Sequence, residues 1–232
     1  MKNIAVILAG GSGSRLGADR PKQFLPLKDG RTVLETCVDA FHQNEHIDEI
    51  AIVMLRDHIA EAQALLPTDR FPKIKYWIPG GKERWESSML ATQALTKAVK
   101  EQNLTDCNVL LHDCARPFIS QNLITRVCEA LQTHEAVSVA VPVTDTLYAV
   151  SQDNPDVIAD IPARALFRRA QTPQSFHLSV LQKAFSLAVQ HMDGLMTDDA
   201  GVVLHYLPEV PIHILPGEES NRKITYKEDL EL

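Results

Sequence analysis

Short apolar runs alternate with helical stripes over most of the first 141 residues, and this alternation constrains the possible folds more than any other feature. The runs that are typical of buried strands lie at 4–8, 47–55, 74–78, 108–112 and 136–141. Apolar residues at helical spacing lie between them, at 33–41, 58–66, 88–99 and 123–131. Helices that connect buried strands indicate parallel neighbours, so the pattern predicts an α/β fold with a mostly parallel, twisted sheet flanked by helices.

The alternation stops after Pro142. Residues 143–163 have the pattern of a strand, a turn at 153–156 and a second strand, which predicts a β arm that protrudes from the domain. A helix at 180–189, a strand at 210–215 and a short helix at 227–232 follow. The polar segments 171–176, 197–200 and 221–225 have the composition of turns or caps. We therefore expect one domain over 1–232, with the arm at 143–163.

Composition and charge narrow the functional class. The 232 residues are 45% hydrophobic and 23% charged, which is typical of a globular protein with a well-buried core. A net charge of −7 argues against a nucleic-acid partner. The chain leads directly into its first strand, and no apolar run approaches the ~18 residues of a membrane span. We expect a cytoplasmic protein without a membrane partner, whose four widely spaced cysteines are reduced core thiols.

The first apolar run leads into a glycine-rich stretch, LAGGSGSRLG at 8–17, which is followed by PKQF at 21–24. Glycine adopts positive φ at no steric cost, so the backbone N–H groups of such a loop can surround a phosphate. Arg15 and Lys22 add positive charge nearby. This combination favours a phosphate-binding loop over a tight strand-to-helix turn with two surface cations.

The positions of the glycines and lysines exclude two common classes of phosphate-binding loop. A dinucleotide fingerprint that used Gly11 and Gly13 would need its third glycine where Leu16 stands. A Walker loop closes with Gly-Lys-Ser or Gly-Lys-Thr, whereas the Gly81-Lys82 pair is followed by Glu83. The glycine stretch therefore belongs to another class of phosphate-binding loop.

Two further segments carry candidate site residues. Asp113 follows the strand at 108–112, at the sheet edge where open α/β proteins bind ligands. Its carboxylate could hold Mg²⁺ beside phosphates, or it could cap a helix or pair with Arg116. The segment 80–88 could frame a nucleotide base, or Ser87 or Ser88 could simply cap the next helix.

Seven ordered blocks together resemble the cytidylyltransferases that act on methylerythritol phosphate and pentitol phosphates. They comprise the glycine loop with PKQF, GGKER at 80–84, HDCARP at 112–117, TDT at 144–146, QTPQSF at 171–176, TDDA at 197–200 and NRKIT at 221–225. The resemblance spans nearly the whole chain. It implies a Rossmann-like nucleotidyltransferase domain of the GT-A type with the β arm attached.

The resemblance also implies roles for individual residues. Catalytic positive charge is implied for Arg15, Lys22 and Lys223. Nucleotide binding is implied for Leu8, Ala9, Gly10, Gly11, Gly13, Ser14, Gly80, Gly81, Ser87, Asp113 and Ala115. Binding of the acceptor is implied for Arg116, Thr146, Arg164 and Thr172, with the arm residues Thr146 and Arg164 reaching the neighbouring subunit of a homodimer. Asp113 is the implied ligand of Mg²⁺ or contact to the ribose.

The implied reaction joins CMP from CTP to a small polyol phosphate and releases pyrophosphate. The acceptor phosphate is already an anion, so alignment and charge neutralisation suffice and no strong base is needed. The opening LAGG, Leu147-Tyr148 after the TDT block, and DIPAR at 160–164 favour D-ribitol 5-phosphate over 2-C-methyl-D-erythritol 4-phosphate. The sequence is also compatible with a nucleotidyltransferase that uses another base and with a non-catalytic nucleotide-binding regulatory protein.

Overall fold

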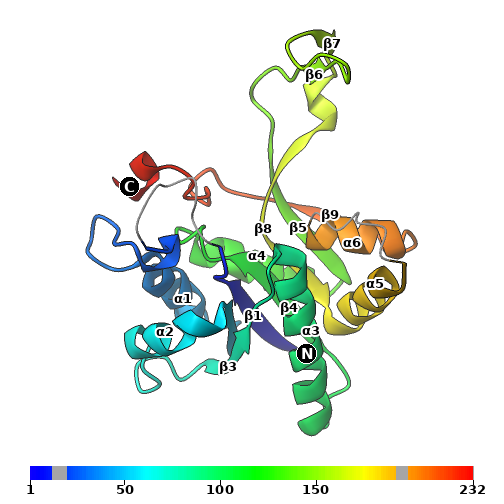
Figure 1. Ribbon diagram of the computed structural model, residues 1–232. Helices are drawn as coiled ribbons and strands as arrows, with labels where there is room; N and C mark the ends of the chain where they lie inside the picture. The colour runs from blue at the N-terminus through cyan, green and yellow to red at the C-terminus, as the bar shows by residue number, and fades with distance from the viewer. Residues whose placement is uncertain (12–19, 192–197, 232) are drawn as a thin grey trace.

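A computed structural model describes residues 1–11, 20–191 and 198–231 of the chain. Its centre is a seven-stranded sheet in the order β3-β2-β1-β4-β8-β5-β9 (Figure 1). The strands are β1 (Lys2–Leu8), β2 (Glu49–Met54), β3 (Ile74–Pro79), β4 (Cys107–Asp113), β5 (Ala136–Pro142), β8 (Arg168–His177) and β9 (His213–Pro216). β1 pairs in parallel with β2 and β4, β2 with β3, and β5 with β9, while β8 is antiparallel to β4 and β5. The predicted α/β fold with a mostly parallel sheet is confirmed.

Helices cover both faces of this sheet. They are α1 (Val33–Gln43), α2 (Ile59–Leu65), α3 (Arg84–Glu101), α4 (Gln121–Ala130), α5 (Leu178–His191) and α6 (Asp199–Tyr206), with short 3-10 turns η2 (Lys22–Phe24), η3 (Arg56–His58), η4 (Arg164–Leu166) and η5 (Lys227–Glu231). One core contains Phe41 of α1 and Ile124 of α4, and a second contains Leu95 of α3 and Leu181 of α5. None of the helices in the described part of the chain is long and apolar enough to cross a membrane.

The prediction of a turn or cap at 171–176 is wrong, because this segment is the buried half of β8, a ten-residue strand between β4 and β5. Gln171, Thr172 and Gln174 are each at most 5% exposed. Side-chain and backbone hydrogen bonds satisfy these polar groups within the fold, so the strand lacks the apolar pattern that hydrophobic periodicity detects.

The starts of α3 and α6 compare differently with the sequence prediction. α3 begins at Arg84, four residues before the predicted start, and Glu83 and Glu86 form its capping box. The prediction that Ser87 or Ser88 caps this helix is therefore wrong. In the segment 197–200, Asp198 caps α6 by accepting a hydrogen bond from the Gly201 N–H at 2.7 Å. The predicted cap is confirmed there, but the eight-residue helix that follows carries no strong sequence signal.

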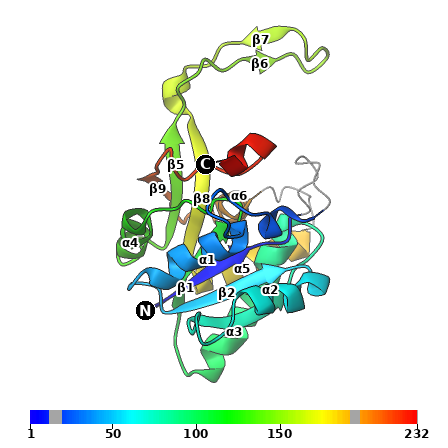
Figure 2. The ribbon, with the colours of Figure 1, turned by 90° about the vertical axis from the view of Figure 1, so that its left-hand side faces the viewer.

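The predicted arm rises from the ends of β5 and β8 (Figure 2). Its tip is a two-stranded antiparallel sheet of β6 (Ala149–Val150) and β7 (Ile158–Asp160), which is separate from the main sheet. Val150, Val157 and Ile161 are 53%, 50% and 59% exposed. The arm thus carries apolar side chains that the described part of this chain does not cover.

Candidate active site

A cleft opens where β1 and β4 end, at the carboxyl edge of the parallel strands. The empty space in this cleft is about 1060 Å³, a volume that includes open solvent at its mouth. Of the predicted site residues, the cleft is lined by Leu8, Ala9, Gly10, Gly11, Lys22, Gly81, Ser87, Asp113, Ala115 and Lys223. Residues far apart in the sequence are therefore brought to one place, as predicted.

The phosphate side of the cleft begins at the end of β1. The Ala9 N–H donates to the Val53 carbonyl at 2.7 Å, which fixes the start of the loop on β2. A Cβ placed on Gly11 would lie 3.6 Å from Cε of Lys22, so the Lys22 side chain runs beside the glycine backbone. The predicted loop residues Gly13, Ser14 and Arg15 lie outside the described residues.

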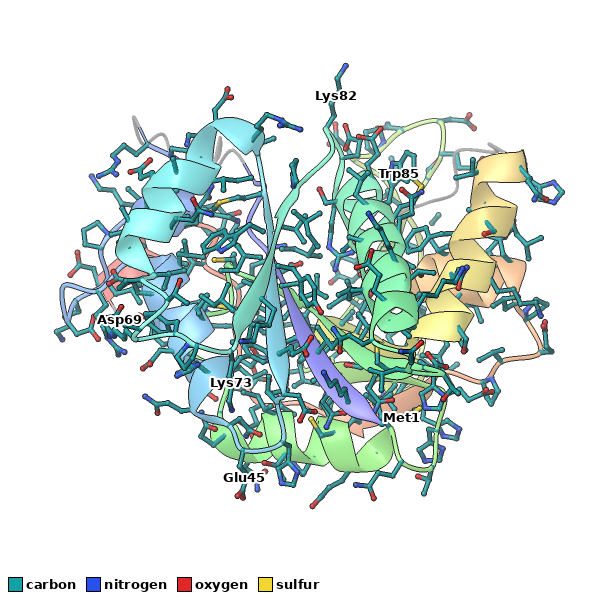
Figure 3. The ribbon with its side chains drawn as sticks, turned by 90° about the horizontal axis from the view of Figure 1, so that it is seen from below. Met1, Glu45, Asp69, Lys73, Lys82 and Trp85 are labelled. Atoms are coloured by element: carbon teal, nitrogen blue, oxygen red, sulfur yellow. The ribbon has the colours of Figure 1, made fainter. Side chains whose placement is uncertain are left out.

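The loop between β3 and α3 closes the opposite wall. The Ser87 hydroxyl accepts a hydrogen bond from the Gly81 N–H at 3.1 Å and donates to the Glu83 carbonyl at 3.2 Å. A Cβ on Gly81 would collide with Cβ of Glu86, so no side chain fits at this position beside the helix. Gly80 lies outside the lining, with its N–H bonded to the Met54 carbonyl. In Figure 3, Lys82 extends outward at this edge, at the opposite end from Met1.

Four charged side chains form a continuous series of ion pairs beside the cleft. One Asp113 carboxylate oxygen accepts from Lys223 Nζ at 2.6 Å, and the other accepts from Arg84 Nε at 3.1 Å. Arg84 also donates through Nη1 to Asp199 at 2.7 Å. Asp199 is fully buried and does not line the cleft. Two cations thus face two carboxylates in alternation.

Burial and pairing set the charge states in this cluster. Burial alone would raise the pKa of the Asp113 carboxyl, but Arg84 and Lys223 outweigh it and hold that pKa well below its usual range. Burial likewise opposes the charge of Arg84, yet the two carboxylates raise the pKa of its guanidinium. Burial raises the pKa of Asp199 in spite of Arg84. Asp113 is therefore a carboxylate at neutral pH, and Arg84 a permanent cation.

Two buried anchors bring Lys223 to the cleft. Asn221 is fully buried and donates to the Thr172 carbonyl at 2.7 Å, and the Ile224 N–H donates to the Ala115 carbonyl at 2.7 Å. Arg222 lies between them and is exposed, so a charged residue beside Lys223 is accommodated without being buried.

Arg116 and Thr172 support the cleft from outside its lining. His112 Nε2 faces the Arg116 carbonyl at 3.0 Å, and its Nδ1 faces the Thr172 hydroxyl at 3.1 Å. A carbonyl only accepts, so Nε2 carries the proton and Nδ1 accepts from Thr172. The Thr172 oxygen in turn accepts from the Asp113 N–H at 3.1 Å. Burial lowers the pKa of His112 to about 4, so this network is neutral and holds the backbone of Asp113 in place.

The arm residues lie outside this cleft. Arg164 donates through Nη1 to the Thr144 carbonyl at 2.7 Å, within the arm itself. Thr146 is exposed on the same arm. Neither residue lines the cleft of its own chain, so their predicted role in binding the acceptor needs a second subunit.

Sequence reasoning missed Arg84 and Asp199. The two residues are 115 positions apart and come together only because the folded chain brings the first residues of α3 and α6 into contact. The one available sequence signal is a charged residue inside a conspicuous block, Arg84 in GGKER and Asp199 in TDDA. Neither block indicates which partner its charged residue contacts.

Strand β1 of the mostly parallel sheet leads to Gly10 and Gly11, beside a cleft that is lined by Lys22 and Lys223, and this arrangement fits a nucleotidyltransferase, the class to which the relatives belong. Residues 3–232 match the family model for 2-C-methyl-D-erythritol 4-phosphate cytidylyltransferase (IspD), and the chain belongs to that family. It is 45% identical to the 2-C-methyl-D-erythritol 4-phosphate cytidylyltransferase of Thermobifida fusca, over 97% of this chain and 89% of that protein.

A second relative and a solved structure add detail. The bifunctional ribulose 5-phosphate reductase/CDP-ribitol pyrophosphorylase Bcs1 of Haemophilus influenzae is 38% identical over 99% of this chain, but the match covers only 47% of that protein. The crystal structure of 4-diphosphocytidyl-2C-methyl-D-erythritol synthase from Anaerococcus prevotii superposes with a TM-score of 0.82 at 26% identity, over 99% of this chain and 92% of that one. The predicted cytidylyltransferase class is confirmed. The comparisons favour the alternative acceptor, 2-C-methyl-D-erythritol 4-phosphate, over the predicted ribitol 5-phosphate.

Proposed function

We propose that this chain transfers the cytidylyl group of CTP to 2-C-methyl-D-erythritol 4-phosphate, with release of pyrophosphate. The observation that carries this proposal is the match of residues 3–232 to the family model for that activity. The cleft supports the reaction type because it places Lys22 and Lys223 around one space beside glycine backbone. This acceptor replaces ribitol 5-phosphate as the preferred substrate.

The proposed reaction needs alignment and positive charge. An oxygen of the acceptor phosphate attacks the α-phosphorus of CTP, the bond to the bridging oxygen of the β-phosphate breaks, and pyrophosphate leaves with that oxygen. Charge builds on the phosphoryl oxygens, where Lys22 and Lys223 would neutralise it. His112 is buried and neutral, and it is not needed as a base because the attacking oxygen is already an anion.

The described residues fit a divalent cation that enters with the nucleotide. No group of three or more His, Cys, Asp or Glu suited to a metal lies within residues 1–11, 20–191 and 198–231. The cleft lining does contain the carboxylates of Glu83 and Asp113, and hard cations pair with carboxylate and phosphate oxygens. We propose that Mg²⁺ is held chiefly by the triphosphate, with Asp113 as its protein ligand, and neutralises charge on the leaving pyrophosphate.

Ribitol 5-phosphate is the second candidate acceptor, because a relative at 38% identity is named as a CDP-ribitol pyrophosphorylase. The two acceptors share a terminal phosphate and differ in carbon skeleton. Thr146 and Arg164 on the arm are proposed to bind the phosphate that both acceptors share, and they lie outside the cleft of a single chain.

We also propose that residues 1–232 act as one domain that forms a homodimer through the arm at 143–163. The exposed apolar side chains of the arm support this, because a two-stranded hairpin is marginal in water unless something covers it. A cytoplasmic location and the absence of nucleic-acid and membrane partners remain predictions from composition.

An assay of pyrophosphate release tests the acceptor. We expect release from CTP with 2-C-methyl-D-erythritol 4-phosphate and a divalent cation, with kcat/KM for ribitol 5-phosphate at least about tenfold lower, a difference of about 1.4 kcal/mol. Chelation of the cation should abolish both reactions, and ATP, GTP and UTP serve as controls for the base. Higher kcat/KM with ribitol 5-phosphate would reverse the assignment, and turnover with neither acceptor would contradict the proposed function.

A further inference from the structure

Asp199 is a buried carboxylate that the proposed reaction does not use. Its side chain has no exposed surface, and one of its oxygens is bound by Arg84 at 2.7 Å. Through Nε the same guanidinium binds Asp113, whose second oxygen holds Lys223 at 2.6 Å. The four side chains come from α6, α3, the end of β4 and the C-terminal segment, and their formal charges sum to zero.

The first turn of α6 is fixed on the sheet, so Asp199 has a defined position. Gln174 of β8 donates to the Asp198 carboxylate at 2.7 Å and accepts from the Ala200 N–H at 3.1 Å. These contacts hold both neighbours of Asp199 against a central strand. Asp199 can therefore act as a fixed anchor for the Arg84 side chain.

Stability alone does not explain this arrangement. Burying a carboxylate costs several kcal/mol, and replacing a buried ion pair with apolar residues is often neutral or stabilising. Burial raises the pKa of Asp199 and outweighs the Arg84 guanidinium and the Ser88 hydroxyl, which both lower it, so the net shift is upward. A fully buried carboxyl group that holds Arg84, a cation in the lining of the cleft, points to a role in the reaction.

We propose that Asp199 and Arg84 are positioning residues that hold Asp113 and allow Lys223 to exchange between Asp113 and the phosphates of the bound nucleotide. This inference rests on the proposed function, because it takes Lys223 to act on those phosphates. If Asp113 had Lys223 as its only protein partner, release of the ammonium would leave its carboxylate in a largely buried place with no fixed cation, dependent on the incoming Mg²⁺ alone. With Arg84 anchored by Asp199, Asp113 stays paired throughout, and the exchange costs less.

A double-mutant cycle between Asp199 and Lys223 tests the inference, because the two residues do not pair with each other. Asp199→Asn keeps the shape and removes the charge. We expect this substitution to lower kcat/KM about tenfold in the wild-type background and less than about twofold in the Lys223→Ala background. Radiolabelled CTP makes the residual turnover of the Lys223→Ala chain measurable.

Glu49→Gln is the matched control. Glu49 is also a largely buried carboxylate, bound to Lys2 at 2.6 Å and Tyr76 at 2.8 Å, but it lies at the start of β2, opposite Ile4 and away from the cleft. Its replacement should lower the melting temperature and leave kcat/KM unchanged in both backgrounds. This control separates a loss of stability from a loss of positioning.

Three results would overturn the inference. Equal losses of kcat/KM from Asp199→Asn in both backgrounds would show a merely structural role, and so would the absence of any loss. Arg84→Lys is the second variant, since it keeps the charge but lacks the fork that reaches two carboxylates, and it should show the same dependence on Lys223. If neither variant folds, the pair serves stability alone. A wild-type chain that is inactive with CTP and both acceptors would instead refute the proposed function.

Discussion

We expect the Lys22→Ala chain to turn over CTP with a kcat on the order of 10²-fold or more below that of the wild-type chain. The Lys22 side chain lines the cleft and runs beside Gly11, where the glycine backbone is proposed to surround the triphosphate. Removing it takes away positive charge that is proposed to stabilise the phosphoryl oxygens more in the transition state than in the ground state. The measurement is steady-state pyrophosphate release at saturating CTP and acceptor.

Lys28→Ala is the control for this prediction, because Lys28 carries the same charge, is exposed and lies outside the cleft lining. Its kcat should match the wild-type value. Arg15→Ala should reduce kcat to a similar degree as Lys22→Ala if Arg15 faces the same phosphates. Undiminished kcat in the Lys22→Ala chain, with an unchanged melting temperature, would remove this lysine from the mechanism.

Mixing two inactive chains should restore activity if the arm completes the neighbouring active site. Arg164→Ala and Lys22→Ala chains are each expected to be nearly inactive alone. In a heterodimer, the subunit that retains Lys22 would receive Arg164 from its partner, so one of the two sites is intact. With random exchange, half of the dimers are heterodimers, and recovery should reach about a quarter of the wild-type activity.

The exposed apolar surface of the arm is the physical reason to expect a dimer. Its exposed side chains include Tyr148, Val150, Ile158 and Ile161, and a twofold partner with an identical arm would cover both copies. Subunit exchange is verified by mass spectrometry of differently tagged chains, and Lys22→Ala mixed with itself should show no recovery. A monomer by light scattering at the assay concentration, or no recovery after verified exchange, would contradict the shared site.

The sequence predicts the sheet well where strands are apolar and fails where burial is polar. β1 and β2 each contain five consecutive apolar residues and β4 contains three, and each is a strand of the mostly parallel sheet. β8 carries Gln171, Thr172 and Gln174 in its buried half, so its pattern resembles that of a loop. Only tertiary hydrogen bonds, such as that from Gln174 to Asp198, make these side chains compatible with the interior.

For the site, the sequence identifies residues but not the contacts between them. Sequence motifs predict Lys22, Asp113 and Lys223 as site residues, and the structure brings all three to one cleft. The pairing of Asp113 with Arg84 and Lys223, and of Arg84 with Asp199, depends on the tertiary fold and cannot be derived from spacing. Acceptor specificity is harder still, because the residues proposed to bind the acceptor lie on an arm that protrudes from the sheet and contributes nothing to the lining of its own cleft.

The central claim is that the acceptor phosphate attacks the α-phosphorus of CTP in this cleft. The most direct test uses 2-C-methyl-D-erythritol 4-phosphate with ¹⁸O in all its phosphate oxygens, followed by mass spectrometry and ³¹P NMR of the products. We predict a cytidine diphosphate product that retains the whole label, including the oxygen that bridges the two phosphorus atoms, and an unlabelled pyrophosphate. Label in the pyrophosphate, or a nucleotide product without a labelled bridge, would contradict this mechanism.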